Sequence, residues 1–350
     1  MKLLSAFGKQ VEQVGTVQRV WLTSFVINIE FIETYVLPVI LGMDPPKLRM
    51  DYEGMQQVLS ERGIDVRVFC DKRFVEPDQN KRTAIPIHGV SPERLSPNAE
   101  INFSERSLFH PKVIYLQGEK GSVLGSGSAN LTVDGWGRNQ EVFSFVPVAS
   151  RNMAESVRSF FEPVFANVQE RFPDDFPAPE QNANLGIDFC HSLAGAPFLT
   201  QLLEGKATEL AVWSPYFSRD ISHYVRSLQR YADAPGLRVQ LVPDRVDNQY
   251  LRAEWSQGLS ELHGHGLLSL HKSPVKRDDR SFMTHAKLWK SPERLAIGSW
   301  NFTQPGSNLI TGSSAQSQNV EAGFIARSDA SLADFVGEAL PLTESLFCLL

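Results

Sequence analysis

The sequence lacks long apolar runs, and this absence argues against a membrane-spanning protein. No stretch approaches the roughly 20 uninterrupted apolar residues that a membrane helix needs. The start, MKLLSAFGKQVEQ, has too short an apolar core for a secretory signal. We therefore expect a soluble, cytoplasmic protein with no membrane partner.

Cysteine is also scarce. The chain has three cysteines, which are scattered and not at metal-ligand spacing: Cys70, Cys190 and Cys348. We interpret them as reduced side chains, so neither a disulfide framework nor a zinc site is expected. The segment ELHGHGLLSLHK is another metal candidate, with three histidines: His263, His265 and His271. No carboxylate or cysteine joins them at ligand spacing, so a surface loop is favoured and no metal or cofactor is expected.

An excess of positive charge is missing as well. The chain has 34 Lys and Arg against 40 Asp and Glu, a net charge of −6, which argues against binding nucleic acid or an anionic membrane through bulk charge. One local basic stretch, residues 271–294, holds seven lysines and arginines against three acids. Two interpretations stay open for it, a solvated face and a track for a phosphate backbone. Three nearby tryptophans are interpreted as packing residues in preference to platforms for stacked bases: Trp136, Trp289 and Trp300.

What the chain does have is an internal repeat. Val20–Leu41 has the pattern of a buried strand, a turn and a helix, and Leu210–Arg230 repeats that plan. Each is followed by a glycine-led strand, from Gly63 and from Gly236, that ends in an acidic–basic turn. A duplicated unit is therefore predicted.

The later parts of the repeat keep the same order. Each half continues with a histidine–lysine run and then a short apolar strand that carries a glutamate, Glu141 or Glu321. Helical stretches over 153–171 and 331–347 are predicted to close the halves. Strands that alternate with helices predict an α/β fold: two pseudo-symmetric α/β sandwich halves, each with a mixed or mostly parallel sheet.

A boundary between the halves is predicted at residues 172–184. This segment, FPDDFPAPEQNAN, is rich in proline and acid, which is typical of a linker. The first half then covers 1–171 and the second 185–350.

The two histidine–lysine runs carry the chemistry. They are HPKVIYLQGEKGSVLGSGSANLT, residues 110–132, and HAKLWKSPERLAIGSWNFT, residues 285–303. On a strand, His-x-Lys sends both side chains to one face. Substitution at phosphorus needs one group to attack and another to protonate the leaving oxygen, so two such motifs facing each other complete one site between the halves. The glutamates are expected to orient the imidazoles.

This pair of motifs resembles that of the phospholipase D superfamily, in which two His-x-Lys motifs, each followed by a Gly-Ser-x-Asn turn, form one metal-independent phosphodiesterase site. The matching residues are His110, Lys112, Gly127, Ser128 and Asn130, and His285, Lys287, Gly298, Ser299 and Asn301. The aspartate expected five residues after each lysine is replaced by Gln117 and Pro292. That departure resembles the tyrosyl-DNA phosphodiesterase branch, where Glu141 and Glu321 look like the equivalents of a glutamine and a glutamate.

The resemblance implies a covalent phosphohistidine. We assign attack to His110 and acid–base work to His285, with the reverse assignment still open. Four residues are expected to hold the nonbridging oxygens: Lys112, Lys287, Asn130 and Asn301. Four small residues are expected to let the backbone approach the substrate and donate to its oxygens: Gly127, Ser128, Gly298 and Ser299.

The preferred function is a nucleic-acid phosphodiesterase, either a nuclease or an end-processing enzyme. The resemblance also makes a bacterial DNA-restriction or phage-defence module conceivable, with a helicase or another subunit as partner. A phospholipid phosphodiesterase or phosphatidyl transferase and a catalytically silent scaffold are the alternatives. Because both motifs lie in one chain, a monomer is sufficient for the site, and a homo-oligomer stays open.

Overall fold

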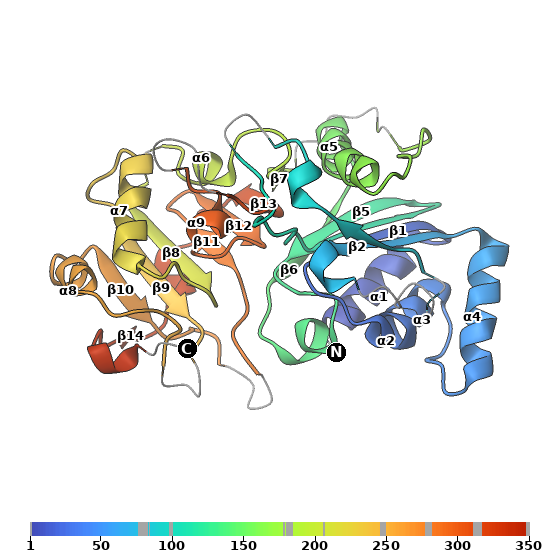
Figure 1. Cartoon of the computed structure of the whole chain (residues 1–350), viewed down its shortest axis with the longest axis horizontal. Coiled ribbons are helices and arrows are strands. Elements are labelled where there is room, and N and C mark those ends of the chain that lie inside the picture. The colour runs from blue at the N-terminus through green and yellow to red at the C-terminus, as the bar shows by residue number, and fades with distance from the viewer. Residues whose placement is uncertain are drawn as a thin grey trace.

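The computed structural model describes residues 2–75, 83, 85–97, 101–177, 179, 185–205, 207–245, 250–276, 282–310 and 317–347. Within these ranges the chain forms one sheet from each half, and the two halves lie next to each other (Figure 1). The fold is α/β with two pseudo-symmetric halves, as the sequence predicts.

The first sheet has the strand order β3-β2-β1-β4-β5-β6. Strands β1, β2 and β3 are parallel, whereas β4, β5 and β6 continue the sheet in antiparallel pairs. Its strands are β1 (Val17–Ser24), β2 (Asp65–Asp71), β3 (Ile87–Val90), β4 (Val113–Gly118), β5 (Gly121–Gly127) and β6 (Phe143–Pro147).

The second sheet repeats that order and extends it at both edges, as β14-β10-β9-β8-β11-β12-β13-β7. Its strands are β7 (Ile187–His191), β8 (Glu209–Ser214), β9 (Arg238–Pro243), β10 (Leu268–His271), β11 (Leu288–Lys290), β12 (Arg294–Gly298), β13 (Ala322–Arg327) and β14 (Ala339–Leu340). Strand β1 thus corresponds to β8, β4 to β11 and β6 to β13.

Helices cover both faces of the first sheet (Figure 1). The α-helices of the chain are α1 (Lys2–Val14), α2 (Ile29–Phe31), α3 (Leu37–Leu41), α4 (Arg49–Arg62), α5 (Arg151–Asn167), α6 (Phe198–Leu202), α7 (Ile221–Tyr231), α8 (Gln257–Gly264) and α9 (Gln304–Ser307). Two π-helical turns are η1 (Ile32–Val36) and η5 (Asp134–Arg138), and 3-10 turns are η2 (Lys72–Phe74), η4 (Pro92–Arg94), η6 (Leu332–Phe335) and η7 (Glu344–Leu346).

Strand β1 shows how the sequence builds these layers. Val20 and Leu22 point to the face covered by α1, α2 and α3, and Trp21 points to the opposite face, covered by α5. This alternation is the two-residue period of a strand buried on both faces. Two of the longer helices begin at side-chain caps, since Ser150 at the start of α5 accepts a hydrogen bond from the Met153 amide and Asp220 at the start of α7 accepts one from the His223 amide.

The apolar core between α5 and the first sheet also contains residues of the second half. Phe160 on α5 packs against Phe189 on β7, and Val320 and Phe324 belong to the same buried cluster. This shared apolar core fixes the position of one half relative to the other.

The C-terminal helix predicted over 331–347 is wrong. This segment forms two 3-10 turns and strand β14, which pairs antiparallel with β10. Gly337 and Pro341 interrupt the helical pattern, and proline removes an amide donor that a helix needs. The predicted helix over 153–171 is present as α5.

The predicted linker, 172–184, lies in the sequence between α5 and β7, and so between the two sheets. Its described residues pack against the first half, because Phe172 and Phe176 contact Trp21 and Asp175 forms an ion pair with Arg19. Part of the segment, 180–184, lies outside the described residues.

Several basic side chains of the stretch 271–294 already have partners within the protein. Lys290 is fully buried and donates to the carbonyls of Ser291, Pro292 and Ser328. Lys272 pairs with Glu338 and Arg294 with Glu204, while Arg277 and Arg280 lie outside the described residues. The described part therefore offers no continuous phosphate track here. The tryptophans are packing residues as predicted, each buried: Trp136, Trp289 and Trp300.

Of the three histidines of 261–272, His263 lies on α8, His271 lies in β10, and His265 lies in the exposed turn that follows α8, so the predicted surface loop holds for His265 alone. His263 on α8 donates to the Leu268 carbonyl, and His271 in β10 contacts Gly337 and Ser269. Within the described ranges, no group of three or more His, Cys, Asp or Glu is arranged to hold a metal ion.

Candidate active site

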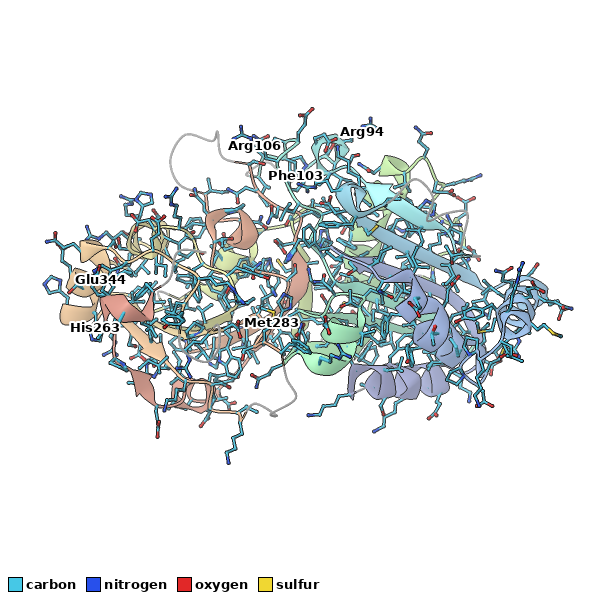
Figure 2. All side chains as sticks on the ribbon, turned by 60° about the horizontal axis from the view of Figure 1, so that its bottom comes forward. Arg94, Phe103, Arg106, His263, Met283 and Glu344 are labelled. Atoms are coloured by element: carbon cyan, nitrogen blue, oxygen red, sulfur yellow. The ribbon has the colours of Figure 1, made fainter. Side chains whose placement is uncertain are left out.

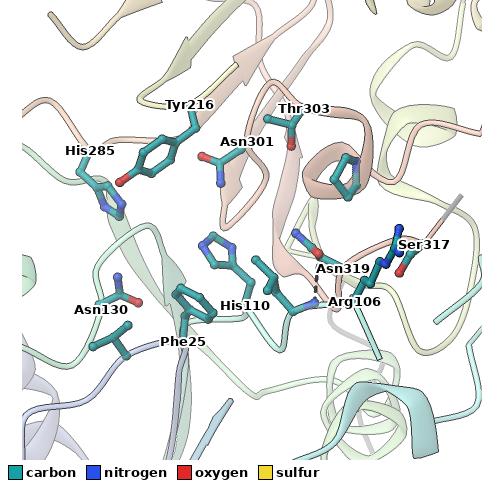
Figure 3. A pocket seen from close by; sticks show the side chains of 13 residues that line it. Phe25, Arg106, His110, Asn130, Tyr216, His285, Asn301, Thr303, Ser317 and Asn319 are labelled. Carbon is teal, nitrogen blue, oxygen red and sulfur yellow. Dashed lines mark hydrogen bonds between the residues drawn. The ribbon is translucent and has the colours of Figure 1, made fainter. Parts of the chain in front are cut away.

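The two histidines of the repeated motifs face one cavity between the halves. His110 lies just before β4 and His285 just before β11, the corresponding strand. Figure 3 shows both rings turned into the same space, with Asn130 and Asn301 beside them. The cavity has a volume of about 630 Å³. It is lined by Phe25, Val26, Arg106, Leu108, His110, Asn130, Tyr216, His285, Asn301, Thr303, Pro305, Ser317 and Asn319.

Each imidazole is held by a glutamate from the opposite half. His110 Nδ1 lies 2.9 Å from Glu321 Oε2, and His285 Nδ1 lies 2.8 Å from Glu141 Oε1. Glu321 directly precedes β13, and Glu141 lies two residues before β6. When Nδ1 carries the proton and donates to the carboxyl group, Nε2 is the ring nitrogen left for chemistry.

Backbone contacts reinforce this exchange across the interface. The His110 amide donates to the Val320 carbonyl over 3.0 Å, and the His285 amide donates to the Gln140 carbonyl over 2.9 Å. The residue before each glutamate thus fixes the main chain of the opposite histidine. The site forms only when the two halves are docked.

Further polar side chains orient the glutamates. Ser128 Oγ donates to Glu141 Oε2, and Asn139 Nδ2 donates to Glu141 Oε1 over 3.3 Å. In the other copy, Asn319 Nδ2 donates to Glu321 Oε1 over 3.3 Å. Asn139 and Asn319 each stand two residues before their glutamate, a regularity of the repeat that the sequence prediction did not use.

The two lysines are buried beneath the histidines. Lys112 Nζ donates to the His110 carbonyl over 2.6 Å, and Lys287 Nζ donates to the His285 carbonyl over 2.9 Å. Lys287 Nζ also lies 3.0 Å from His285 Nε2. Burial has removed most of the water from both ammonium groups. A phosphoryl oxygen that enters the cavity would therefore be a strong hydrogen-bond acceptor for them in place of that water.

The two asparagines differ in their partners. Asn130 Oδ1 accepts a hydrogen bond from Ser24 Oγ over 3.3 Å. Asn301 Oδ1 is buried and has no hydrogen-bond partner among the described residues. A buried polar atom without a partner costs folding free energy, which is typical of groups retained for a ligand.

The four small residues pack between strands next to the cavity. Gly127, Ser128, Gly298 and Ser299 do not line the cavity, and both serines are fully buried. A Cβ on Gly127 would lie 2.2 Å from the Val142 carbonyl oxygen, and one on Gly298 would lie 2.6 Å from the Ala322 oxygen. The Ser128 and Ser299 hydroxyls accept from the amides of Val142 and Ala322. The structure therefore places them between neighbouring strands, where the two serines contact Glu141 and Glu321. Their predicted contact with a substrate stays a prediction.

Two buried aspartates at the site were missed as functional residues. Asp71 Oδ2 accepts from the Phe109 amide over 2.8 Å, and Asp244 Oδ1 accepts from the Thr284 amide over 2.7 Å. Phe109 and Thr284 directly precede the two histidines. The acidic–basic turns at the ends of the glycine-led strands were the signal, since Asp71 pairs with Arg73 there.

Two serines play matching roles on the adjacent strands. Ser24 Oγ accepts from the Leu131 amide and Ser214 Oγ accepts from the Phe302 amide, each over 2.9 Å. These contacts hold the residue that follows each asparagine. In the sequence, these serines could have been found because each is the last residue of a corresponding strand, β1 or β8.

Burial and charge make the two halves of the site electrostatically unequal. Burial lowers the pKa of His110 well below its usual range, and the charges of Lys112 and Lys287 lower it further. Burial raises the pKa of Glu321 to about 8, against the opposing effect of Lys112. The Glu321 carboxyl is therefore largely protonated at neutral pH.

The other pair behaves differently. Burial alone raises the pKa of Glu141, but the charge and hydrogen bond of His285 outweigh it and lower that pKa below its usual value. Burial, with the charge of Lys287, lowers the pKa of His285, and Glu141 opposes this. Burial also lowers the pKa of Lys287 to about 8. An ionised carboxylate beside His285 favours a proton on that imidazole.

Aromatic side chains flank the histidines and were not predicted. The Phe25 ring meets the His110 ring edge-on at 5.3 Å, and Tyr216 meets His285 edge-on at 6.2 Å between centroids. Both line the cavity, and Figure 3 shows them on either side of the two imidazoles.

One family model matches part of the first half. Residues 48–164, which contain the first motif, match the family model described as cardiolipin synthase, PLD-like domain. No curated protein matches the sequence. No helix in the described part of the chain is long and apolar enough to cross a membrane.

Several solved structures have the same fold at low sequence identity. A mutant of yeast tyrosyl-DNA phosphodiesterase superposes with a TM-score of 0.55 at 12% identity, covering 93% of this chain and 86% of that one. Phosphatidylserine synthase from Haemophilus influenzae gives a TM-score of 0.53 at 12% identity, covering 93% and 81%. Polyphosphate kinase from Porphyromonas gingivalis gives 0.50 at 12% identity, covering 93% and 43%. These structures confirm the predicted duplicated fold, and residues 48–164 carry the resemblance to a PLD-like domain.

Proposed function

We propose that this phospholipase D-like chain is a phosphodiesterase that cleaves nucleic acid through a covalent phosphohistidine, without a metal ion. One observation carries the proposal. Two imidazoles face a single cavity, and each is tied through Nδ1 to a buried glutamate of the opposite half. That arrangement supplies a nucleophile and an acid on two sides of one phosphorus atom.

The first step forms a nitrogen–phosphorus bond. The lone pair on His110 Nε2 attacks phosphorus, and the bond from phosphorus to the leaving oxygen breaks. His285 Nε2 gives its proton to that oxygen. Burial lowers the pKa of both imidazoles, but it lowers that of His110 further, whereas the ionised Glu141 opposes the lowering at His285, so His285 is the ring that takes up a proton more readily. This inequality supports the assignment of attack to His110.

The second step restores the enzyme. His285 Nε2 takes a proton from water, the water oxygen attacks phosphorus, and the phosphorus–nitrogen bond to His110 breaks. Lys112, Lys287 and the two asparagines hold the nonbridging oxygens as negative charge grows on them.

Nucleic acid is the proposed substrate because of the cavity lining. Phe25 and Tyr216 offer ring faces and edges to bases on both sides of the histidines, and Arg106 adds a cation. The similar structures include a tyrosyl-DNA phosphodiesterase and a phosphatidylserine synthase, so the fold alone fits either substrate class. The defence module, and a helicase or another subunit as partner, stay predictions.

A cleavage assay in EDTA tests the proposal. Labelled single- and double-stranded DNA, RNA, a 3′-blocked oligonucleotide and phosphatidylglycerol vesicles are incubated with the parent protein, His110→Ala and His285→Ala. His223→Ala, which changes an exposed histidine on α7, is the control. We expect nucleic-acid cleavage that survives EDTA, is absent from both site variants and is unchanged in the control. Cleavage of the lipid alone would overturn the substrate, and activity lost in EDTA would overturn the mechanism.

Tungstate binding separates an enzyme from a silent scaffold. The oxyanion mimics a phosphoryl group and stabilises the folded state by mass action, by roughly 2.7 kcal/mol at 100 times its Kd. The melting temperature should rise for the parent protein and stay constant for Lys287→Met. No rise in the parent protein would favour a scaffold.

A further inference from the structure

The active-site cavity extends to one side of the two histidines. Beyond His110 it continues past Asn319 and Ser317 to Arg106, which Figure 3 shows at the far end from His285. Figure 2 shows Arg106 at the outer edge of the molecule, so this end of the cavity opens to solvent.

On the other side of the pseudo-dyad, two segments of the chain meet near His285. The π-helical turn η5 and the segment at Phe282 and Met283 lie there, joined by hydrogen bonds from the Phe282 amide to the Arg138 carbonyl and from the Gln140 amide to the Met283 carbonyl.

A hydroxyl network fixes the loop that carries Arg106. Ser104 Oγ donates to Ser317 Oγ over 2.7 Å, and Ser107 Oγ lies 2.7 Å from the same oxygen. The Arg106 amide donates to Ser104 Oγ over 3.2 Å. Because Ser317 belongs to the second half, this network ties the loop across the interface and sets the position from which the Arg106 side chain extends.

The Arg106 guanidinium is unneutralised within the described structure. No described carboxylate forms an ion pair with it, whereas Arg73 pairs with Asp71 and Arg138 with Asp134. Among the described residues that line this cavity, Arg106 is the one with a basic side chain, and it lies four residues before His110 in the sequence. At the extended-chain limit of about 3.6 Å per residue, their Cα atoms are at most about 14 Å apart.

We propose that Arg106 binds the phosphate next to the scissile one, on the His110 side of the site. This inference rests on the proposed function and narrows its substrate to a strand with at least two successive phosphodiesters. A guanidinium donates two parallel hydrogen bonds to a phosphate, and such a contact sets the register of the strand without reading its sequence. A phospholipid with one phosphodiester has no group for this position.

The test compares two substrates that differ in the neighbouring phosphate. A short single-stranded oligonucleotide has one, and bis(p-nitrophenyl) phosphate does not. Parent protein, Arg106→Ala and Arg106→Lys are assayed on both, with Arg138→Ala as the matched control, an arginine near the site that already has a carboxylate partner.

We expect Arg106→Ala to lower kcat/KM for the oligonucleotide by roughly tenfold, mainly through KM, the scale of a charge-assisted hydrogen bond. Turnover of bis(p-nitrophenyl) phosphate should not change. The slope of log kcat/KM against log salt should become less steep by about 0.7 for the oligonucleotide. Arg106→Lys should retain part of the effect, and Arg138→Ala should match the parent protein.

Two results would overturn the inference alone: an equal loss on both substrates, which indicates a structural role, or no loss on either. A parent protein that turns over bis(p-nitrophenyl) phosphate and cleaves no nucleic acid would overturn the proposed function, and this subsite with it.

Discussion

His285 Nδ1 lies 2.8 Å from Glu141 Oε1, although the two residues belong to different halves of the chain and are 144 positions apart. His110 and Glu321 form the reciprocal pair, 211 positions apart. Neither half therefore contains a complete catalytic pair. Each half lends its glutamate to the other, which explains why the shared core between the halves is as important to the site as the motifs themselves.

The Glu141 carboxylate should be required for the acid–base role of His285. Replacing it with glutamine keeps the size but removes the charge that favours a proton on His285. We expect Glu141→Gln to lower kcat by roughly 10²–10⁴-fold, the scale of general acid–base catalysis, with KM little changed. Glu155→Gln, an exposed position on α5, is the control. Steady-state rates close to those of the parent protein would show that Glu141 does not tune His285.

Replacing Asn301 should lower activity without lowering the stability of the fold. Its Oδ1 atom is buried without a hydrogen-bond partner among the described residues, so Asn301→Ala removes a polar atom that costs folding free energy. The melting temperature should stay constant or rise, while kcat falls by roughly 10²–10³-fold, the scale of one transition-state donor. Asn130→Ala, which loses a bond to Ser24, should lose both stability and activity. A lower melting temperature for Asn301→Ala would contradict the retained-for-ligand role.

Asp71 should act as a positioning residue for His110. Asp71→Ala leaves the Phe109 amide without its buried acceptor, at a cost of about 1–3 kcal/mol in the free energy of unfolding. We expect kcat to fall and KM to change little, and Asp71→Asn, which keeps one oxygen acceptor, to restore much of both. Urea denaturation and steady-state kinetics check this. If Asp71→Asn is as damaged as Asp71→Ala, the charge and not the hydrogen bond is what matters.

Glu321 should make the protein less stable as pH rises. Its pKa is about 8 in the folded protein, above the ordinary value of 4.5, so the folded state holds a proton that the unfolded state has lost between those values. This contribution to stability is complete below pH 4.5 and is lost as pH rises toward 8. In Glu321→Gln the contribution is absent. Urea midpoints measured across this window should therefore fall more for the parent protein than for the variant, and parallel curves would refute the shifted pKa.

Much of this molecule follows from local sequence patterns. The order of the repeated parts, the two-residue period of His-x-Lys and the strand-helix alternation predicted the duplicated fold and a site between the halves. The reciprocal exchange of Glu141 and Glu321 did not follow, because it depends on how two separately folded sheets dock. The extent of burial at Asp71 and Ser299 likewise depends on neighbours distant in sequence.

The differences from the sequence predictions have local physical reasons. The missing Cβ atoms of Gly127 and Gly298, which were predicted to let the backbone approach a substrate, allow close approach of the neighbouring strand. The apolar pattern of 331–347 predicted a helix, but strand pairing between β14 and β10 prevails where Gly337 and Pro341 weaken the helix.

The covalent intermediate is the central claim, and a burst experiment with His285→Asn tests it most directly. A nucleoside 5′-(p-nitrophenyl phosphate) has a leaving group that needs no acid, so the first step can proceed while the second, which needs His285, is blocked. We predict one equivalent of p-nitrophenolate per active site, followed by little turnover. Mass spectrometry at alkaline pH should find the nucleotide on the peptide that contains His110. A full turnover rate without an adduct would contradict the covalent mechanism, and an adduct found in the parent protein at His285 would reverse the roles of the two histidines.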